Sequence, residues 1–203
     1  LLVAVLLMTS ACAKRKDDGG KTPDDGLTAT EAFAKFQEEE LITYLKASKL
    51  SAHYTVTDLS KYGLEDMTVT IGDPKEEDGI DPEDSLARLK AIDRAQLSEA
   101  DQNLYDRYKA YLELQARYDG LDDYYYLFTP NSGLNNNLLS NFVEYVIRKE
   151  EDITDVIVYL NECRSYIDGC LDLVKEHAAN GVRQDKECMQ GIIDQVDQFL
   201  ETK

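Results

Sequence analysis

The sequence predicts an all-α fold: a multi-helix array with one irregular or extended insertion, forming part of a larger helical domain. Two observations carry this prediction. Apolar residues recur every three or four positions through most of residues 28–203, which is the spacing of one face of a helix. Helix-capping signals, such as Ser98-Glu99-Ala100-Asp101, separate the periodic stretches. A hydrophobic share of 43% is enough for a packed core.

The first residues of the chain indicate its location. Residues 1–8 are all apolar, small residues follow them, and Cys12 comes next. Such a run spans only ~12 Å as a helix, whereas the hydrocarbon core of a membrane is ~30 Å thick, so it does not cross a bilayer. Residues 1–11 resemble the C-terminal part of a bacterial lipoprotein signal peptide, with Cys12 as the lipidated first residue of the mature protein. We therefore expect an extracytoplasmic protein, anchored by lipid to the bacterial cell membrane, with further signal residues upstream of Leu1.

After Cys12, the sequence predicts a tether and then a folded body, residues 28–203. Residues 12–27 are charged and rich in glycine, which predicts a disordered tether. Residues 51–72 contain two short β-branched stretches, 53–57 and 67–71, and we expect extended segments or loop there. Asp81-Pro82 starts a helix that runs to about residue 92, and Ser98 starts another that runs to about residue 118. The helix that opens the body has an apolar face of Phe33, Phe36, Leu41, Tyr44 and Leu45.

In the second half of the body, the spacing of apolar residues predicts helices over about 138–147 and 151–179, and one more at the end of the chain. The longest helix repeats its apolar residues about every 3.5 positions over four heptads, so we expect a buried seam. That seam consists of Ile153, Val156/Ile157, Leu160, Cys163, Ile167, Cys170/Leu171, Val174 and His177/Ala178. The last helix is expected to pack through Cys188, Ile192, Val196, Phe199 and Leu200.

Charge and motifs exclude several functions. The net charge of −18 argues against nucleic acid, because binding phosphates needs clustered basic residues. Cys163, Cys170 and His177 share a helix face but rise ~10 Å per step, too far for one zinc ion. We find no His-Glu-x-x-His, no nucleophile elbow and no phosphate loop, and we expect no cofactor, metal ligand or catalytic residue on this chain. Cys170 and Cys188 either bridge a helical hairpin or remain buried thiols.

One segment is a candidate for contact with a ligand. Tyr124, Tyr125 and Tyr126 form an aromatic run in a connection, and Asn135 follows in a polar stretch. Rings and amides in a loop suit the binding of a peptide or a sugar. Packing of the connection is the interpretation that we favour.

Several short stretches occur in a characteristic order over about residues 28–203: His53-Tyr54-Thr55, Lys61-Tyr62-Gly63-Leu64, Leu97-Ser98-Glu99-Ala100-Asp101-Gln102, residues 124–133, Glu151-Asp152-Ile153, Tyr159-Leu160, Tyr166 and Ala179-Asn180-Gly181. This order resembles that of bacterial lipoproteins of domain-of-unknown-function family 885. The resemblance implies a mostly helical, zinc-dependent, metallopeptidase-like hydrolase whose metal motif, His-Glu-x-x-Pro-Gly-His, lies in the C-terminal part of family members. This chain has no such segment, and Asn135-Asn136-Asn137 replaces a more apolar stretch.

Two functions follow as expectations. In the first, the chain is the N-terminal helical part of a surface lipoprotein, incomplete and inactive alone, which forms one wall of a peptide cleft with the remainder of its own chain. In the second, it is a non-catalytic helical lipoprotein that binds a peptide, glycan or protein partner.

Overall fold

The computed structural model describes residues 26–75, 79–118, 120–121 and 124–201, which contain seven α-helices and no β-strand. The prediction of an all-α fold is therefore confirmed. Cys12, the signal segment and nearly all of the tether lie outside the described residues. The body divides into two compact units: described residues 26–68 and 79–118 form the first, and 69–75, 120–121 and 124–201 form the second.

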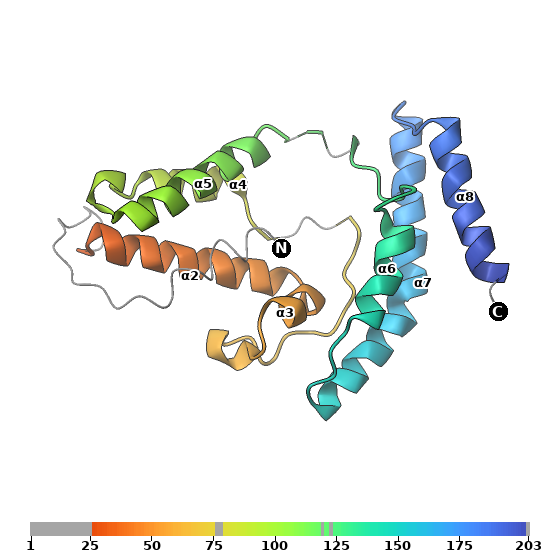
Figure 1. Cartoon of the computed structure of the whole chain (residues 1–203), viewed down its shortest axis with the longest axis horizontal. Coiled ribbons are helices and arrows are strands. Elements are labelled where there is room, and N and C mark those ends of the chain that lie inside the picture. Colours follow the sequence, from red (N-terminus) through yellow and green to blue (C-terminus); the bar gives the residue numbers. More distant parts are fainter. Residues whose placement is uncertain (1–25, 76–78, 119, 122–123, 202–203) are drawn as a thin grey trace. The chain divides into compact units, whose positions relative to one another are not determined.

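The first unit is a set of closely packed helices. Helix α2 (Ala29–Ala47) packs against α3 (Lys49–Thr55) and α4 (Pro82–Lys90), and α4 packs against α5 (Glu99–Gln115) (Figure 1). Two short 3₁₀ turns, η1 (Leu59–Tyr62) and η2 (Arg94–Gln96), connect these helices. The four helix starts have side-chain caps from Thr28, Ser48, Asp81 and Ser98.

One stretch of the first unit differs from expectation. Residues 51–55, where extended segments or loop were expected, belong to helix α3. The oxygen of Ser48 accepts a hydrogen bond from the amide of Ser51, which starts the helix, and Leu50 and Ala52 are buried on its inner face. Burial and a cap outweigh the local β-preference of the residues that follow. The other stretch, 67–71, has no helix or strand.

The core of the first unit is continuous. Phe33 and Phe36 of α2 contact the rings of Tyr105 and Tyr108 of α5, with centroids 6.1 and 5.8 Å apart respectively. Edge and tilted contacts of this kind add to the free energy gained by burying the rings. The buried core consists of Ala29, Phe33, Phe36, Leu41, Leu45, Ala52, Leu64, Leu89, Ile92, Leu97, Leu104, Tyr105, Tyr108 and Leu112.

The second unit is built on the long helix α7 (Glu150–Ala179), together with α6 (Leu134–Val143) and α8 (Lys186–Glu201). Residues 69–75 lie along α7: the amide of Ile71 donates to Glu162 Oε2 at 2.8 Å. Pro74 approaches Gly169 so closely that a Cβ there would lie 2.9 Å from its ring. Glycine at position 169 therefore permits residues 69–75, here called the strap, to lie against the helix.

Helix α6 starts four residues earlier than predicted, at Leu134. The reason is the polar stretch before it. The side-chain amide of Asn136 donates to Pro130 O at 3.2 Å, and that of Asn137 donates to Ser132 O at 2.8 Å. These amides join the first turn of the helix to the preceding loop, so they support a helix start rather than a connection.

Candidate binding surface

The exposed apolar face of α7 is the main candidate site of the second unit. Ile153, Ile157 and Leu160, here called the α7 stripe, are each about half exposed. The prediction of a buried seam is therefore wrong for the N-terminal half of this helix, although Cys170 farther along is fully buried. Spaced by four and three residues, the three side chains lie on one face of the helix. Such a face is shaped to pack against a second helix.

The orientation of α7 explains why the stripe faces outward. Asp152, at the start of the helix, accepts hydrogen bonds from the backbone amides of Arg148 and Lys149 at 2.7 and 3.1 Å. Seven residues on, Tyr159 is fully buried, and its ring lies 6.1 Å from that of Tyr145. The face that carries Asp152 and Tyr159 is therefore inside, and the neighbouring apolar face remains outside.

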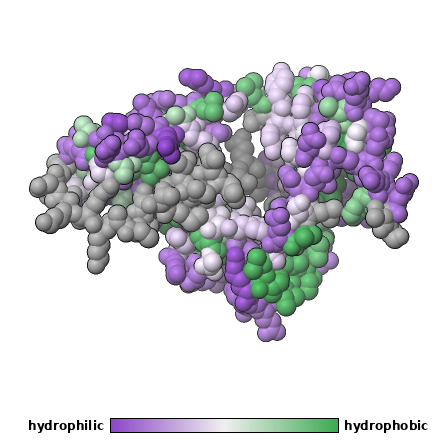
Figure 2. All heavy atoms as spheres, viewed as in Figure 1, coloured by the Kyte–Doolittle hydropathy of each residue, from purple (hydrophilic) through white to green (hydrophobic). Residues whose placement is uncertain are grey.

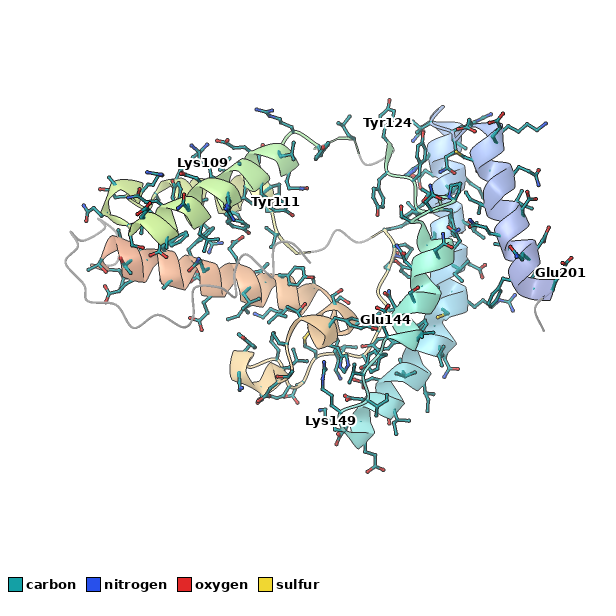
Figure 3. All side chains as sticks on the ribbon, in the orientation of Figure 1. Lys109, Tyr111, Tyr124, Glu144, Lys149 and Glu201 are labelled. Carbon is teal, nitrogen blue, oxygen red and sulfur yellow. The ribbon has the colours of Figure 1, made fainter. Side chains whose placement is uncertain are left out.

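More apolar side chains are exposed just before α7. Val143 at the end of α6 is almost fully exposed, and Val146 and Ile147 in the following connection are about half exposed. Figure 2 shows hydrophobic atoms gathered over the part of the second unit where Figure 1 draws α6 and the first turns of α7. Glu144 and Lys149, labelled in Figure 3, lie in the same region. Exposed apolar patches of this kind mark interaction sites.

Helix α8 repeats the pattern. Its packed face contains Ile192, which is buried, and Gln195, whose side-chain amide donates to Pro130 O at 2.6 Å. Gly191 lies over the ring of Pro130 on the same face. The expected packing through Val196, Phe199 and Leu200 is wrong, because all three are exposed. A second stripe therefore faces outward, here called the α8 stripe: Met189, Ile193, Val196 and Leu200.

Acidic side chains run beside the α8 stripe. Asp194, Asp197 and Glu201, here called the acidic edge, repeat the spacing of Ile193, Val196 and Leu200 one residue later, so they occupy the adjacent face. All three are exposed, and Asp194 accepts a hydrogen bond from the Gln190 side chain at 2.8 Å. Figure 3 labels Glu201 at the C-terminal end of the helix. The surface of α8 thus joins an apolar stripe to a row of negative charge.

The aromatic candidates are exposed and Asn135 is not. Tyr124 and Tyr125 are well exposed in the connection that leads to α6, and the Tyr126 hydroxyl approaches Arg183 O at 3.5 Å. In Figure 3, Tyr124 projects from this connection. Asn135 uses its amide within the fold: it donates to Gln195 Oε1 at 2.7 Å and accepts from the amide of Thr129 at 3.3 Å. The tyrosines are therefore available to a ligand, whereas Asn135 joins α6 to α8.

A second polar site, in the first unit, was missed by sequence reasoning. Glu40 is buried and accepts hydrogen bonds from the hydroxyls of Ser85 and Tyr108, at 2.9 and 2.6 Å, and from the Arg88 guanidinium at 2.9 Å. Arg88 also donates to Glu39 at 2.6 Å. Burial and the hydrogen bond to Glu40 raise the pKa of Tyr108 far above its usual range. We call Glu40, Ser85, Arg88 and Tyr108 the Glu40 cluster.

The Glu40 cluster is a structural connection between helices α2, α4 and α5. Ser85, Arg88 and Tyr108 all donate to this carboxylate, and the Arg88 guanidinium lies over the Phe36 ring, 5.3 Å from its centroid. A carboxylate that is satisfied in this way holds three helices together, because each donor would be costly to bury without it. In the sequence, Glu40 follows two other acids, Glu38 and Glu39, and residue type does not distinguish it from them. The one sequence signal of its burial is its position next to Leu41, on the apolar face of the helix.

The cysteines of the described residues are protonated thiols. Cys163, Cys170 and Cys188 are all free thiols. Burial raises the pKa of the Cys163 and Cys170 thiols, and the hydrogen bond with Asp185 raises that of Cys188, which keeps them protonated. Within the described part of the chain, no group of three or more His, Cys, Asp or Glu could hold a metal, and no helix is long and apolar enough to cross a membrane.

Comparison with known proteins gives no match. No family model, curated protein or solved structure is similar to this chain.

Proposed function

We propose that this chain is the helical body of an extracytoplasmic, lipid-anchored binding protein that holds an amphipathic helix of a protein partner on the α7 stripe. The observation that carries the proposal is the outward orientation of Ile153, Ile157 and Leu160. Fully burying an exposed side chain of this kind gains about 1.5–3 kcal/mol, and because these three are about half exposed, a partner can gain roughly half of that from each.

A helix fits this surface better than an extended peptide. The α7 stripe is a straight row at four- and three-residue spacing, which matches the ridge of a second helix and not the two-residue period of a strand. The anchor on Cys12 and the tether would hold this surface outside the cell membrane.

The zinc-dependent hydrolase activity implied by the family resemblance stays a prediction. No observation on the described residues adds to it, so binding is the function that we put forward. Changing Cys12→Ala in a chain with a complete signal peptide should move the protein from the membrane fraction to the soluble fraction, which tests the anchor.

The binding surface can be tested in the cells that make the protein. A benzophenone amino acid placed at position 157 should give one discrete cross-linked product on illumination. The partner segment, mapped by mass spectrometry, should have apolar residues at three- and four-residue spacing. The same amino acid at position 114, an exposed leucine of the first unit, is the control. No product at position 157, the same products at both positions, or a partner segment without that spacing would contradict the proposal.

A further inference from the structure

We infer that the α8 stripe and its acidic edge bind the amphipathic helix of a protein partner that carries Lys or Arg along one edge. This inference rests on the proposed function, because it assigns chemistry to the partner helix. The inference adds two things to the proposed function: the partner helix is basic along one edge, and the second unit has a second docking place, the α8 stripe. The argument depends on the position of the acids relative to the apolar row.

The acidic edge borders only one side of the stripe. On the other side lies the packed face with Ile192, which is occupied by the segment around Pro130. A helix laid on Ile193 and Val196 therefore meets negative charge along one of its edges and the fold along the other. A partner with basic residues on that single edge would satisfy both sides of the contact.

Among the residues that the structure describes, nothing compensates this charge. The last turn of α8 has no basic residue, and the carboxylates of Asp197 and Glu201 stand where the helix dipole is negative. No ion pair to the acidic edge occurs among residues 26–75, 79–118, 120–121 and 124–201. A cation supplied by the partner would relieve the repulsion and the unfavourable dipole interaction together.

The same charges argue against two other occupants. A second copy of this chain would bring its own acidic edge against the first, and each chain has a net charge of −18. A membrane surface of anionic lipid would repel Asp194, Asp197 and Glu201, whereas helices that lie on such surfaces have basic flanks.

The test uses the full chain and two synthetic peptides of about 21 residues, or three heptads. Both carry a leucine stripe; one has lysines along a single edge, and the other has glutamates at the same positions. We expect the lysine peptide to bind at least tenfold more tightly at low salt in fluorescence anisotropy, and the difference to shrink as salt is raised.

Matched variants separate a local site from the overall negative charge. Asp194→Asn, Asp197→Asn and Glu201→Gln together should abolish the preference for the lysine peptide. Glu38→Gln, Glu65→Gln and Asp66→Asn remove the same charge from exposed positions of the first unit and should leave it intact. For the stripe, Ile193→Gln with Val196→Gln should weaken both peptides at least tenfold. Leu114→Gln is the control, since Leu114 is as exposed as Val196 (46% and 44%).

Several results would overturn the inference: equal binding of the two peptides, no binding of either, equal effects of the two charge variants, or no effect of Ile193→Gln with Val196→Gln. Stronger binding to phosphatidylcholine–phosphatidylglycerol vesicles than to the lysine peptide, or a chain dimer in sedimentation that the Ile193→Gln/Val196→Gln variant loses, would assign the stripe to a membrane or to a second copy instead. Failure of the proposed function shows separately, as a missing cross-link at position 157. Circular dichroism confirms that each variant is folded.

Discussion

The two units of this chain use similar amphipathic helices in opposite ways. In the first unit, the apolar faces of α2, α4 and α5 meet in one continuous core around Phe33 and Tyr108. In the second unit, α7 and α8 turn polar or mixed faces inward and leave apolar rows outside. Of the large hydrophobic side chains that are exposed among the described residues, all but Leu114 and Tyr118 belong to the second unit. Periodicity therefore identifies an apolar face, but not what covers it.

The largest expected effect is the difference in unfolding free energy lost when a buried ring and an exposed ring are each replaced by alanine. Phe33→Ala removes a buried ring that stacks on Phe36 and contacts Tyr105, and it should lower the free energy of unfolding by about 3–5 kcal/mol. Phe199→Ala removes an exposed ring of the second unit and should change it by less than about 0.5 kcal/mol. Urea unfolding followed by circular dichroism measures both. A loss at Phe199 as large as that at Phe33 would show that α8 is packed in solution.

The next largest effect is the loss of unfolding free energy when a carboxylate that connects two segments is replaced, and each unit has one such carboxylate. Glu40→Gln weakens three hydrogen bonds in a buried setting, including the one from charged Arg88, and should cost about 2–3 kcal/mol. Glu162→Gln in the second unit affects the bonds from Thr70 and Ile71 at a more exposed position and should cost about 1 kcal/mol. The same unfolding experiment applies. Equal costs would mean that burial of the Glu40 cluster adds nothing to its strength.

Alkaline pH provides a test specific to the first unit. The folded chain holds the Tyr108 proton more tightly than the unfolded chain, whose tyrosines have a pKa near 10.0. The stability that this difference contributes is therefore complete below about pH 10 and is lost as the pH rises above it. Tyr108→Phe should cost about 1–2 kcal/mol at neutral pH and should flatten the decline above pH 10.

Urea unfolding measured at a series of pH values from 7 to above 10 tests this prediction. Tyr125→Phe, which removes the hydroxyl of an exposed ring, is the control. An unchanged alkaline decline in Tyr108→Phe would contradict the role of the Glu40 cluster.

The smallest effect concerns the acidic edge. Glu201→Gln removes a negative charge from the last turn of α8, where the helix dipole disfavours it, and should stabilise the helix by a few tenths of a kcal/mol. The change should appear as slower amide hydrogen exchange at the end of α8, and it should vanish at high salt. Faster exchange in the variant would mean that Glu201 has a partner that stabilises it.

Sequence reasoning predicted the helices better than it predicted their surroundings. The start of α5 at Ser98 and the bounds of α7 followed from caps and spacing, because these signals are local. The stretch at residues 51–55 was misread because burial of Leu50 and Ala52 outweighs local preference. For α7, periodicity could not reveal that the face with Asp152 and Tyr159 would be buried and the apolar row left outside. Likewise, the Glu40 cluster depends on residues up to 68 positions apart, which no local pattern connects.

The outward orientation of the apolar rows can be measured most directly on isoleucine methyl groups. In the chain labelled at isoleucine methyls, a soluble paramagnetic agent should broaden the signals of Ile153, Ile157 and Ile193 strongly. It should leave the buried Ile92 and Ile192 nearly unchanged, so each unit contains its own reference. This result would establish that the second unit presents an apolar surface to solvent, ready for a partner helix. Protection of Ile153, Ile157 and Ile193 equal to that of Ile92 would contradict it, because these rows would then already be covered.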